Sequence, residues 1–284
     1  MVPETVSEPL SWRHLRSLRP VPHVPANGID LCYERRGRGP RLLFLNGSGS
    51  SIATSELLIK VFTNDFEVLV HDQRGLGDSE IPPGPYTMAD YAADAVALLD
   101  HAGWERARIV GVSFGGMVAQ ELAVTWPERV VRLALLCTSP GGAGGASYPL
   151  HELARLSEPE RNAKGLELLD SRFTPEWLAA HPSDRALADM MAARRNKTKT
   201  SEQLRGEELQ LEARSQHDVC DRLERITCPT LIACGRFDLI APPTNGEAIA
   251  ARVAGADLRS YEGGHAFFAQ DPAALPGVIS FLAG

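Results

Sequence analysis

The chain has 284 residues, of which 44% are hydrophobic and 23% charged, a composition typical of a soluble globular protein. A formal net charge of −7 without a long basic run argues against binding to nucleic acid. No apolar run approaches the ~18 residues that a membrane span needs. Five cysteines without paired spacing indicate a reducing compartment rather than a disulfide framework or a C-x-x-C metal site. Since the N-terminal residues do not resemble a signal peptide, we expect a cytoplasmic protein.

The N-terminal segment differs from the rest of the chain. Residues 1–24 are rich in proline and arginine and predict an irregular arm, with one short helical turn around residues 11–18. Asn27-Gly28 then separates two strand-like segments, residues 21–25 and 29–35. This dipeptide between such segments is a strong hairpin signal, so regular structure is expected from about residue 25 onward.

Apolar strands then alternate with helices joined by short connections. Thr87 and Asp90 suit an N-terminal capping pair for the second of these helices. The alternation predicts an α/β fold, a doubly wound and mostly parallel sheet covered on both faces. The expected strands are residues 41–45, 66–70, 131–137, 230–234 and 257–261. The expected helices are residues 55–61, 86–102, 243–253 and 272–282.

The alternation is interrupted by a long strand-free stretch. It begins at a glycine-rich hinge, Pro140-Gly-Gly-Ala-Gly-Gly145, and is too long for an ordinary loop. We therefore expect a helical lid over residues 140–222, inserted into a core made of residues 25–139 and 223–284. Helical patterns within the lid cover residues 166–171, 175–180, 185–194 and 202–215.

A G-x-S-x-G sequence lies between a strand-like run and a helical run. In Gly111-Val-Ser113-Phe-Gly115, the glycines permit a turn so tight that the serine takes strained backbone angles. The serine oxygen is then held at the carboxyl end of the sheet, and the N–H of Phe114 points from a helix N-terminus toward the reacting atom. This context predicts that Ser113 is a nucleophile.

A nucleophilic serine needs a base, and the base needs an orienting acid. Asp238 follows the strand 230–234, and His265 lies in a glycine-flanked turn after the strand 257–261. The order serine, aspartate, histidine is the one expected when all three project from strand ends of a doubly wound sheet. The sequence therefore predicts Ser113, Asp238 and His265 as a catalytic triad.

Structural alternatives exist for both partners of the serine. Asp238 suits a helix N-cap before Pro242-Pro243, and His265 suits a surface turn. Asp218, Asp257 and Asp271 compete less well for the role of acid, because none directly follows a central strand. The stretch Asp72–Ser79 is interpreted as a structural turn, with its arginine bracing a loop.

Taken together, these motifs resemble the α/β-hydrolase family over about residues 25–284. They are Asn46-Gly-Ser-Gly, Asp72-Gln-Arg-Gly-Leu-Gly-Asp-Ser79, Gly111-Val-Ser-Phe-Gly-Gly116, Gly235-Arg-Phe-Asp238 and Gly263-Gly-His265. The resemblance implies an oxyanion hole made by the backbone N–H groups of Ser48 and Phe114, with no metal or organic cofactor. Many relatives carry His-Gly where this chain has Asn46-Gly47. Asn-Gly in this loop resembles the sequence of 3-oxoadipate enol-lactonases and related small-ester hydrolases.

The resemblance implies a serine hydrolase that cleaves carboxylic esters or lactones of small to medium substrates through an acyl-enzyme. Asn46, Gly47, His217 and Trp177 are candidate substrate contacts. A surface position is favoured over a pocket position for His217, and packing of the lid on the core is an alternative for Trp177. Two other functions remain open: cofactor-free perhydrolysis of the haloperoxidase type on the same triad, and ligand binding without turnover. Aspartate at the elbow, which dehalogenases and epoxide hydrolases carry, is replaced here by Ser113.

Overall fold

The computed structural model describes residues 21–284, apart from the side chain of Ala154. The predicted arm of residues 1–24 lies almost wholly outside this range, as does the helical turn predicted at residues 11–18. Among the described residues, no helix is long and apolar enough to span a membrane.

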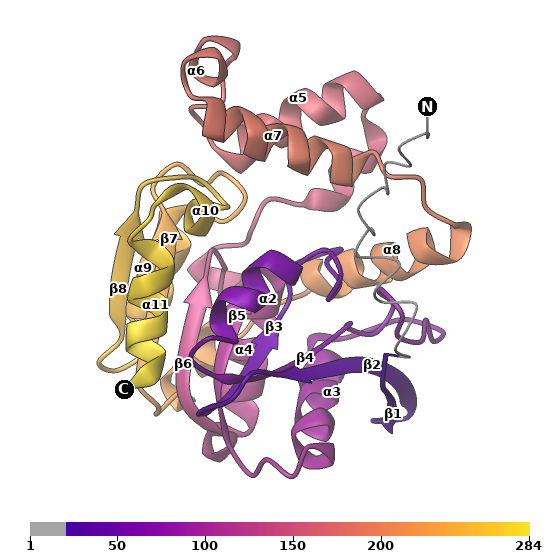
Figure 1. The fold of residues 1–284 in the computed structure, drawn as a ribbon, viewed down its shortest axis with the longest axis vertical. Coiled ribbons are helices and arrows are strands. Elements are labelled where there is room, and N and C mark those ends of the chain that lie inside the picture. The colour runs from indigo at the N-terminus through magenta and orange to yellow at the C-terminus, as the bar shows by residue number, and fades with distance from the viewer. Residues whose placement is uncertain (1–20) are drawn as a thin grey trace, which may run out of the picture.

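An eight-stranded sheet forms the centre of the fold, in the order β1-β2-β4-β3-β5-β6-β7-β8. Strand β1 pairs antiparallel with β2, and β2 pairs antiparallel with β4. All other neighbouring strands in the sheet are parallel. The predicted doubly wound, mostly parallel sheet is therefore confirmed (Figure 1). The strands are β1 His23–Ala26, β2 Ile29–Arg36, β3 Arg41–Leu45, β4 Glu67–His71, β5 Ala107–Val112, β6 Val130–Leu136, β7 Thr230–Gly235 and β8 Asp257–Tyr261.

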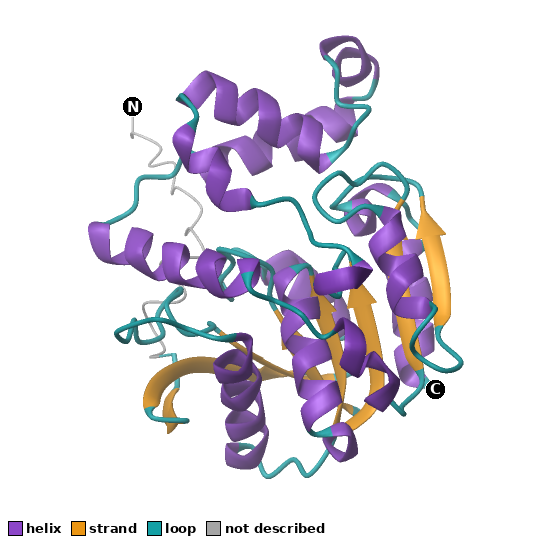
Figure 2. Cartoon of the chain, turned by 180° about the vertical axis from the view of Figure 1, so that it is seen from behind, coloured by secondary structure: helices purple, strands orange, loops and turns teal. Residues whose placement is uncertain are grey.

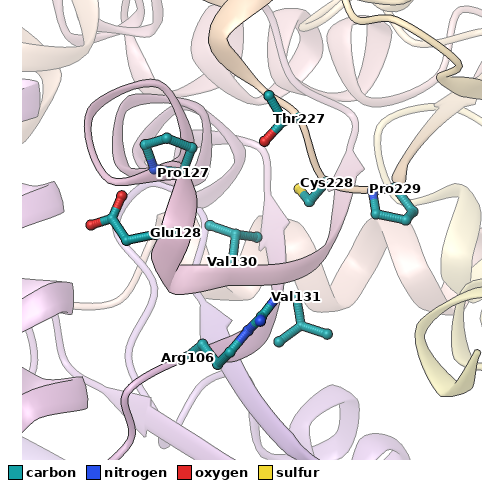
Figure 3. Close-up of a pocket in the computed structure, with 8 residues that line it drawn as sticks. All are labelled: Arg106, Pro127, Glu128, Val130, Val131, Thr227, Cys228 and Pro229. Carbon is teal, nitrogen blue, oxygen red and sulfur yellow. The ribbon is translucent and has the colours of Figure 1, made fainter.

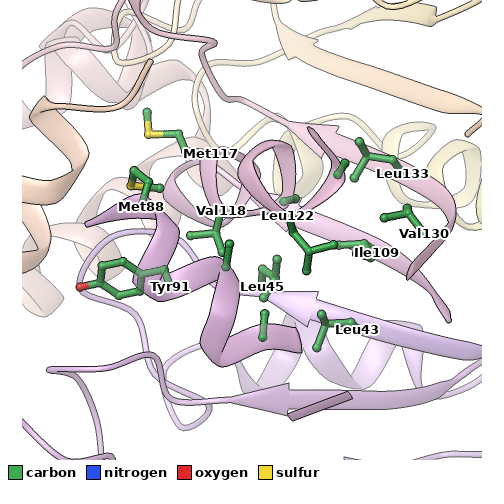
Figure 4. Close-up of a cluster of buried hydrophobic side chains, with 14 of the residues drawn as sticks. Leu43, Leu45, Met88, Tyr91, Ile109, Met117, Val118, Leu122, Val130 and Leu133 are labelled. Atoms are coloured by element: carbon green, nitrogen blue, oxygen red, sulfur yellow. The ribbon is translucent and has the colours of Figure 1, made fainter. Parts of the chain in front are cut away.

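Helices cover both faces of the sheet because alternate strand residues point to opposite sides. Leu43 and Leu45 of β3 pack into one apolar cluster, whereas Leu42 and Phe44 pack into the other. The first cluster includes side chains of α3 and α4 (Figure 4) and Ile249 of α9, and the second includes side chains of α2 and α11. The sheet therefore lies between two helical layers (Figure 2). The helices of the two layers are α2 Glu56–Phe62, α3 Met88–His101, α4 Phe114–Thr125, α9 Pro243–Ala250, α10 Phe267–Gln270 and α11 Ala274–Ala283.

Four further α-helices of the described chain lie between β6 and β7 in sequence, and we call them the insertion helices. They are α5 Glu158–Leu169, α6 Pro175–Ala180, α7 Pro182–Arg195 and α8 Ser201–Ser215. Helix α8 lies between the core and helices α5 and α7 (Figures 1 and 2). The first of them begins well before the predicted residue 166. Ser157 and Glu160 form a capping box there, which starts the helix upstream of its apolar residues.

Local signals at the other helices correspond to specific contacts. The predicted pair at the start of α3 is a capping box, in which the Thr87 side chain accepts the N–H of Asp90 and the Asp90 carboxylate accepts the N–H of Thr87. The helix predicted over residues 272–282 corresponds to α11, and the sequence analysis did not predict the short helix α10, which ends just before Asp271.

The turn after β4 is braced by a buried ion pair. Arg74 donates from Nε and Nη2 to the two carboxylate oxygens of Asp94 on α3, both at 2.6 Å. The Asp94 side chain has no solvent exposure, and Asn27 also donates to it at 2.8 Å. The structural interpretation of the stretch Asp72–Ser79 is consistent with this bracing role.

We expect Asp94→Asn to lower the free energy of unfolding by about 3 to 5 kcal/mol, because it leaves the Arg74 charge buried without a counter-charge. Asp100→Asn on the same helix is the matched control. Its carboxylate pairs with Arg129 but is 64% exposed, so its loss is expected to cost less than about 1 kcal/mol. Urea unfolding of the two variants measures the difference, and equal effects would contradict a buried, uncompensated charge.

The last residue of β4 makes stability depend on pH. Burial lowers the pKa of His71 to about 4, whereas an exposed histidine has a pKa of about 6.5. Between these values the unfolded chain binds a proton that the folded protein does not bind. The stabilisation is therefore complete above about pH 6.5 and is lost as the pH falls toward 4, by roughly 3 kcal/mol.

We expect His71→Asn to reduce the slope of unfolding free energy against pH between 6.5 and 4 by about half, whatever its effect at pH 7, because burial also lowers the pKa of His217 to about 4 and that residue keeps its share of the slope. His151→Asn, at an exposed site, serves as the control and should leave the wild-type slope unchanged. Urea titrations at four pH values measure both slopes. An unchanged slope in His71→Asn would mean that the pKa of His71 is the same in the folded and unfolded protein, which would contradict this account.

Candidate active site

Ser113 lies in a strained turn between β5 and α4. Its φ of 54° and ψ of −113° fall in a region that residues other than glycine rarely adopt. The neighbouring glycines explain how the turn closes. A Cβ on Gly111 would overlap the carbonyl oxygen of Gly115, and a Cβ on Gly115 would overlap that of Leu45. Strand β5, helix α4 and the end of β3 thus approach as closely as the backbone allows, and this approach fixes the position of the serine.

The structure brings the three predicted triad residues together. The Nε2 atom of His265 lies 3.0 Å from the Oγ of Ser113, and its Nδ1 lies 2.8 Å from Oδ2 of Asp238. Asp238 follows β7 and His265 follows β8, so both side chains reach the serine from the carboxyl edge of the sheet. Asp238 is buried, and the histidine side chain is 14% exposed. The arrangement can move a proton from the serine hydroxyl to an imidazole that a carboxylate orients.

Asp238 is also held by its own turn. Its Oδ1 accepts the backbone N–H groups of Ile240 and Ala241 at 2.8 and 2.9 Å. The alternative N-cap role is not what the structure shows, because α9 begins at Pro243 with Pro242 as its N-cap. One carboxylate oxygen therefore fixes the turn, while the other remains directed at His265.

The loop that carries His265 is anchored by residues that the sequence analysis missed. The backbone N–H of His265 donates to the carbonyl of Leu169, at the end of α5, at 2.6 Å. The side chain of Gln270 accepts the N–H of Gly264 at 2.9 Å and donates to the buried carboxylate of Asp170 at 2.9 Å. No local pattern signals the bonds from His265 to Leu169 and from Gln270 to Asp170, because they join segments about 100 residues apart.

The loop after β3 passes directly beside the serine. A Cβ on Gly47 would lie 3.6 Å from the Cβ of Ser113. Among the described residues, the N–H groups of Ser48 and Phe114 donate no backbone hydrogen bond. Both amide atoms of the buried Asn46 side chain also lack a partner there. Unused donors thus lie on both sides of the serine, as an oxyanion hole requires.

The loop after β3 is also held by hydrogen bonds from two of the insertion helices, α7 and α8. Gln210 of α8 has no solvent exposure, and its Oε1 accepts the N–H of Gly49 at 2.8 Å. Its Nε2 donates to Gln73 at 3.1 Å, and Gln73 donates in turn to the carbonyl of Asn46 at 2.9 Å. Arg194 of α7 donates to the carbonyl of Gly49 at 3.1 Å. The sequence analysis missed Gln210 because its partners are more than 130 residues away.

The remaining candidate contacts are placed differently from one another. His217 is only 5% exposed and burial lowers its pKa to about 4, so the favoured surface position was wrong. It is buried because the chain after α8 packs against the hinge, where Val219 donates to the carbonyl of Pro140. The ring of Trp177 stacks on His181 at 3.8 Å, and its Nε1 donates to Asp184 at 2.8 Å. These contacts fit packing within the insertion helices rather than substrate contact.

A group of metal-type donors lies at the turn after β4. Within residues 21–284, the donors that cluster are Cys32, Asp72 and Asp78. The Asp72 carboxylate accepts the N–H groups of Ile52 and Asp78 at 2.6 and 2.9 Å, so it serves the turn itself.

A surface hollow of about 510 Å³ lies at the amino ends of β5, β6 and β7, at the opposite edge from the triad (Figure 3). Its position makes it unsuitable for chemistry at Ser113. It is lined by Arg106, Pro127, Glu128, Val130, Val131, Thr227, Cys228 and Pro229.

Comparison with known proteins places the chain in a family. The alpha/beta hydrolase fold family matches residues 40–272. The chain is 26% identical over 255 residues to 3-oxoadipate enol-lactonase 2 of Acinetobacter baylyi, covering 89% of this chain and 92% of that protein. It is 28% identical over 243 residues to a poly(3-hydroxyalkanoate) depolymerase of Ectopseudomonas oleovorans, covering 85% and 83%.

A solved structure shows the same fold. The enol-lactonase from Burkholderia xenovorans LB400 superposes with a TM-score of 0.75 at 24% identity, covering 93% of this chain and 100% of that one. Sequence, topology and the geometry around Ser113 agree, and the chain belongs to the α/β-hydrolase fold family.

Proposed function

We propose that this protein is a serine hydrolase that cleaves carboxylic esters or lactones through an acyl-enzyme. The observation that carries the proposal is the continuous hydrogen-bonded line from Asp238 through His265 to Ser113, at 2.8 and 3.0 Å. Family membership supports it, as do relatives named as an enol-lactonase and a polyester depolymerase.

Each residue has a distinct role in this mechanism. His265 takes the proton of Ser113 as the serine oxygen attacks the ester carbonyl, and later gives it to the leaving alcohol. Asp238 holds the ring in the required tautomer and stabilises its charged form. The N–H groups of Ser48 and Phe114 stabilise the negative oxygen of the tetrahedral intermediate. Water activated by the same histidine then hydrolyses the acyl-enzyme.

We further propose that residues 140–222 act as a lid on this site. The end of α5 is tied to both catalytic loops by backbone hydrogen bonds. The N–H of Leu239 donates to Leu168 at 3.2 Å, and that of His265 donates to Leu169 at 2.6 Å. The lid therefore supports the acid and base directly, in addition to covering the substrate.

We expect Ser113→Ala to abolish hydrolysis of aryl esters and small lactones, because no other residue supplies the attacking oxygen. Its melting temperature is expected to stay close to that of the wild type, since the turn is set by the flanking glycines. A graded series of aryl esters and lactones, assayed with both proteins, measures this. Residual turnover at wild-type rates would exclude Ser113 as the nucleophile.

Asp238→Asn is expected to lower kcat by about 10³- to 10⁴-fold, because the amide no longer fixes the catalytic tautomer of His265. Asp257→Asn is the matched control. Its carboxylate lies on β8 and pairs with Arg259, away from the serine. Near-wild-type kcat in Asp238→Asn would assign the acid role to another carboxylate.

Gln210→Leu is expected to lower kcat about 10- to 100-fold with little change in KM, because the loop that carries Ser48 loses its support from α8. Affinity for an alkyl boronic acid, which mimics the tetrahedral intermediate, should fall in parallel. Gln216→Leu, at an exposed position just after the same helix, is the control. A change in melting temperature without a change in boronic acid affinity would reduce Gln210 to a structural role.

A further inference from the structure

Arg214 of α8 is a buried cation with more than half of its hydrogen-bonding capacity unused. The residue is 6% exposed, and its Nη1 donates to the carbonyl of Tyr148 at 2.8 Å. Its Nε and Nη2 atoms are buried and have no partner among the described residues. A buried charge without a counter-charge is unfavourable unless a partner arrives from outside.

The position of Arg214 follows from the contacts of α8 and the residues after it. Gly206 packs against Gly75, in the loop after β4, and Gln210 holds Gly49, in the loop after β3. Further along, Asp218 pairs with Gly141, after β6. In the sheet the order is β4-β3-β5-β6, so the segment from Gly206 to Asp218 crosses these strand ends in that order. Arg214 falls between the contacts at β3 and β6, over the end of β5, where Ser113 lies.

The groups around Arg214 leave its charge uncompensated. Burial lowers the pKa of the guanidinium to about 10, and the charge of Asp238 opposes this shift only in part. Asp238 makes no hydrogen bond with the Nε or Nη2 of Arg214; its oxygens accept hydrogen bonds from His265, Ile240 and Ala241. Among the described residues, no carboxylate pairs with the free Nε and Nη2 of Arg214, although the charge of Asp238 is close enough to act on the guanidinium.

The two unused atoms identify the chemistry of the missing partner. Nε and Nη2 form the edge of a guanidinium that binds the two oxygens of one carboxylate in parallel. Elsewhere in the described chain, Arg74 binds both carboxylate oxygens of Asp94 through Nε and Nη2, and Arg172 binds Asp170 in the same way. Arg214 offers the same edge with no protein carboxylate to fill it.

We propose that Arg214 binds a carboxylate carried by the substrate, so that the preferred substrates are esters or lactones with a second, ionised carboxyl group. This inference rests on the proposed hydrolase function and adds its substrate class. Cationic substrates and long neutral acyl chains are then disfavoured, because each would leave the guanidinium unpaired in a buried site.

The test compares esters that differ only in the charge at the far end. Methyl hexanoate is paired with monomethyl adipate, and methyl butanoate with monomethyl succinate, with acid release followed at constant pH 7.5. In the wild type, kcat/KM is expected to favour the charged member of at least one pair. In Arg214→Gln this charged-to-neutral ratio is expected to fall about 10- to 100-fold. Arg214→Lys keeps the charge without the bidentate edge and should be intermediate.

Arg205→Gln on the same helix is the matched control. Arg205 is exposed and donates to the carbonyls of Ile81 and Pro82, so its loss should leave the ratio at the wild-type value. Turnover of neutral esters with no preference for either charged ester, and a ratio unchanged in Arg214→Gln, would overturn the proposal while the hydrolase function stands.

A binding measurement separates this inference from the hydrolase proposal. Calorimetric titration with adipate and with inorganic phosphate is expected to show that wild type binds adipate, with weaker binding of phosphate and loss of adipate binding in Arg214→Gln.

If no ester is hydrolysed, the hydrolase function fails, and this titration still decides the carboxylate site. If Arg214→Gln does not fold, competition by adipate against methyl hexanoate turnover in wild type and Arg214→Lys decides it. Equal adipate affinity in wild type and an Arg214 variant, or no competition, would overturn it.

Discussion

The backbone at Ser113 is the constraint on which the rest of the site depends. A strained φ is retained in a folded protein only where the surrounding structure enforces it. Here β3, β5 and α4 meet with no room for side chains at Gly111 or Gly115. The same close approach places Ser113 beside Gly47 and opens the N-terminus of α4 toward it. This close approach costs about 1 to 3 kcal/mol of backbone strain at Ser113, and it sets the positions of the proposed nucleophile and the proposed oxyanion donors together.

The insertion helices belong to the site as much as the sheet does. The end of α5 binds the loops of Asp238 and His265, while Gln210 and Arg194 bind the loop after β3. Helix α8 thus contacts the loop after β3 through Gln210, and it carries Arg214, for which we propose a role in substrate binding, one turn further along. In our proposal, this one helix would therefore both bind the substrate and support the loop beside Ser113.

The sequence predicted those parts of the molecule that short-range physics determines. Strand β3 and helix α6 follow from apolar runs and a proline start, and the serine turn follows from its two glycines. The missed features are long-range: Gln210, Gln270 and Arg214 act on partners tens to more than a hundred residues away. His217 was misplaced for the same reason, because only the packing of the chain after α8 on Pro140 buries it.

The account rests on Ser113 as the residue that becomes covalently acylated. Labelling the intact protein with an alkyl fluorophosphonate, followed by mass spectrometry of its peptides, tests this most directly. The account predicts one adduct, located on Ser113, absent from Ser113→Ala and strongly slowed in Asp238→Asn. An adduct on another residue, or full ester turnover by a protein that takes up no label, would contradict it.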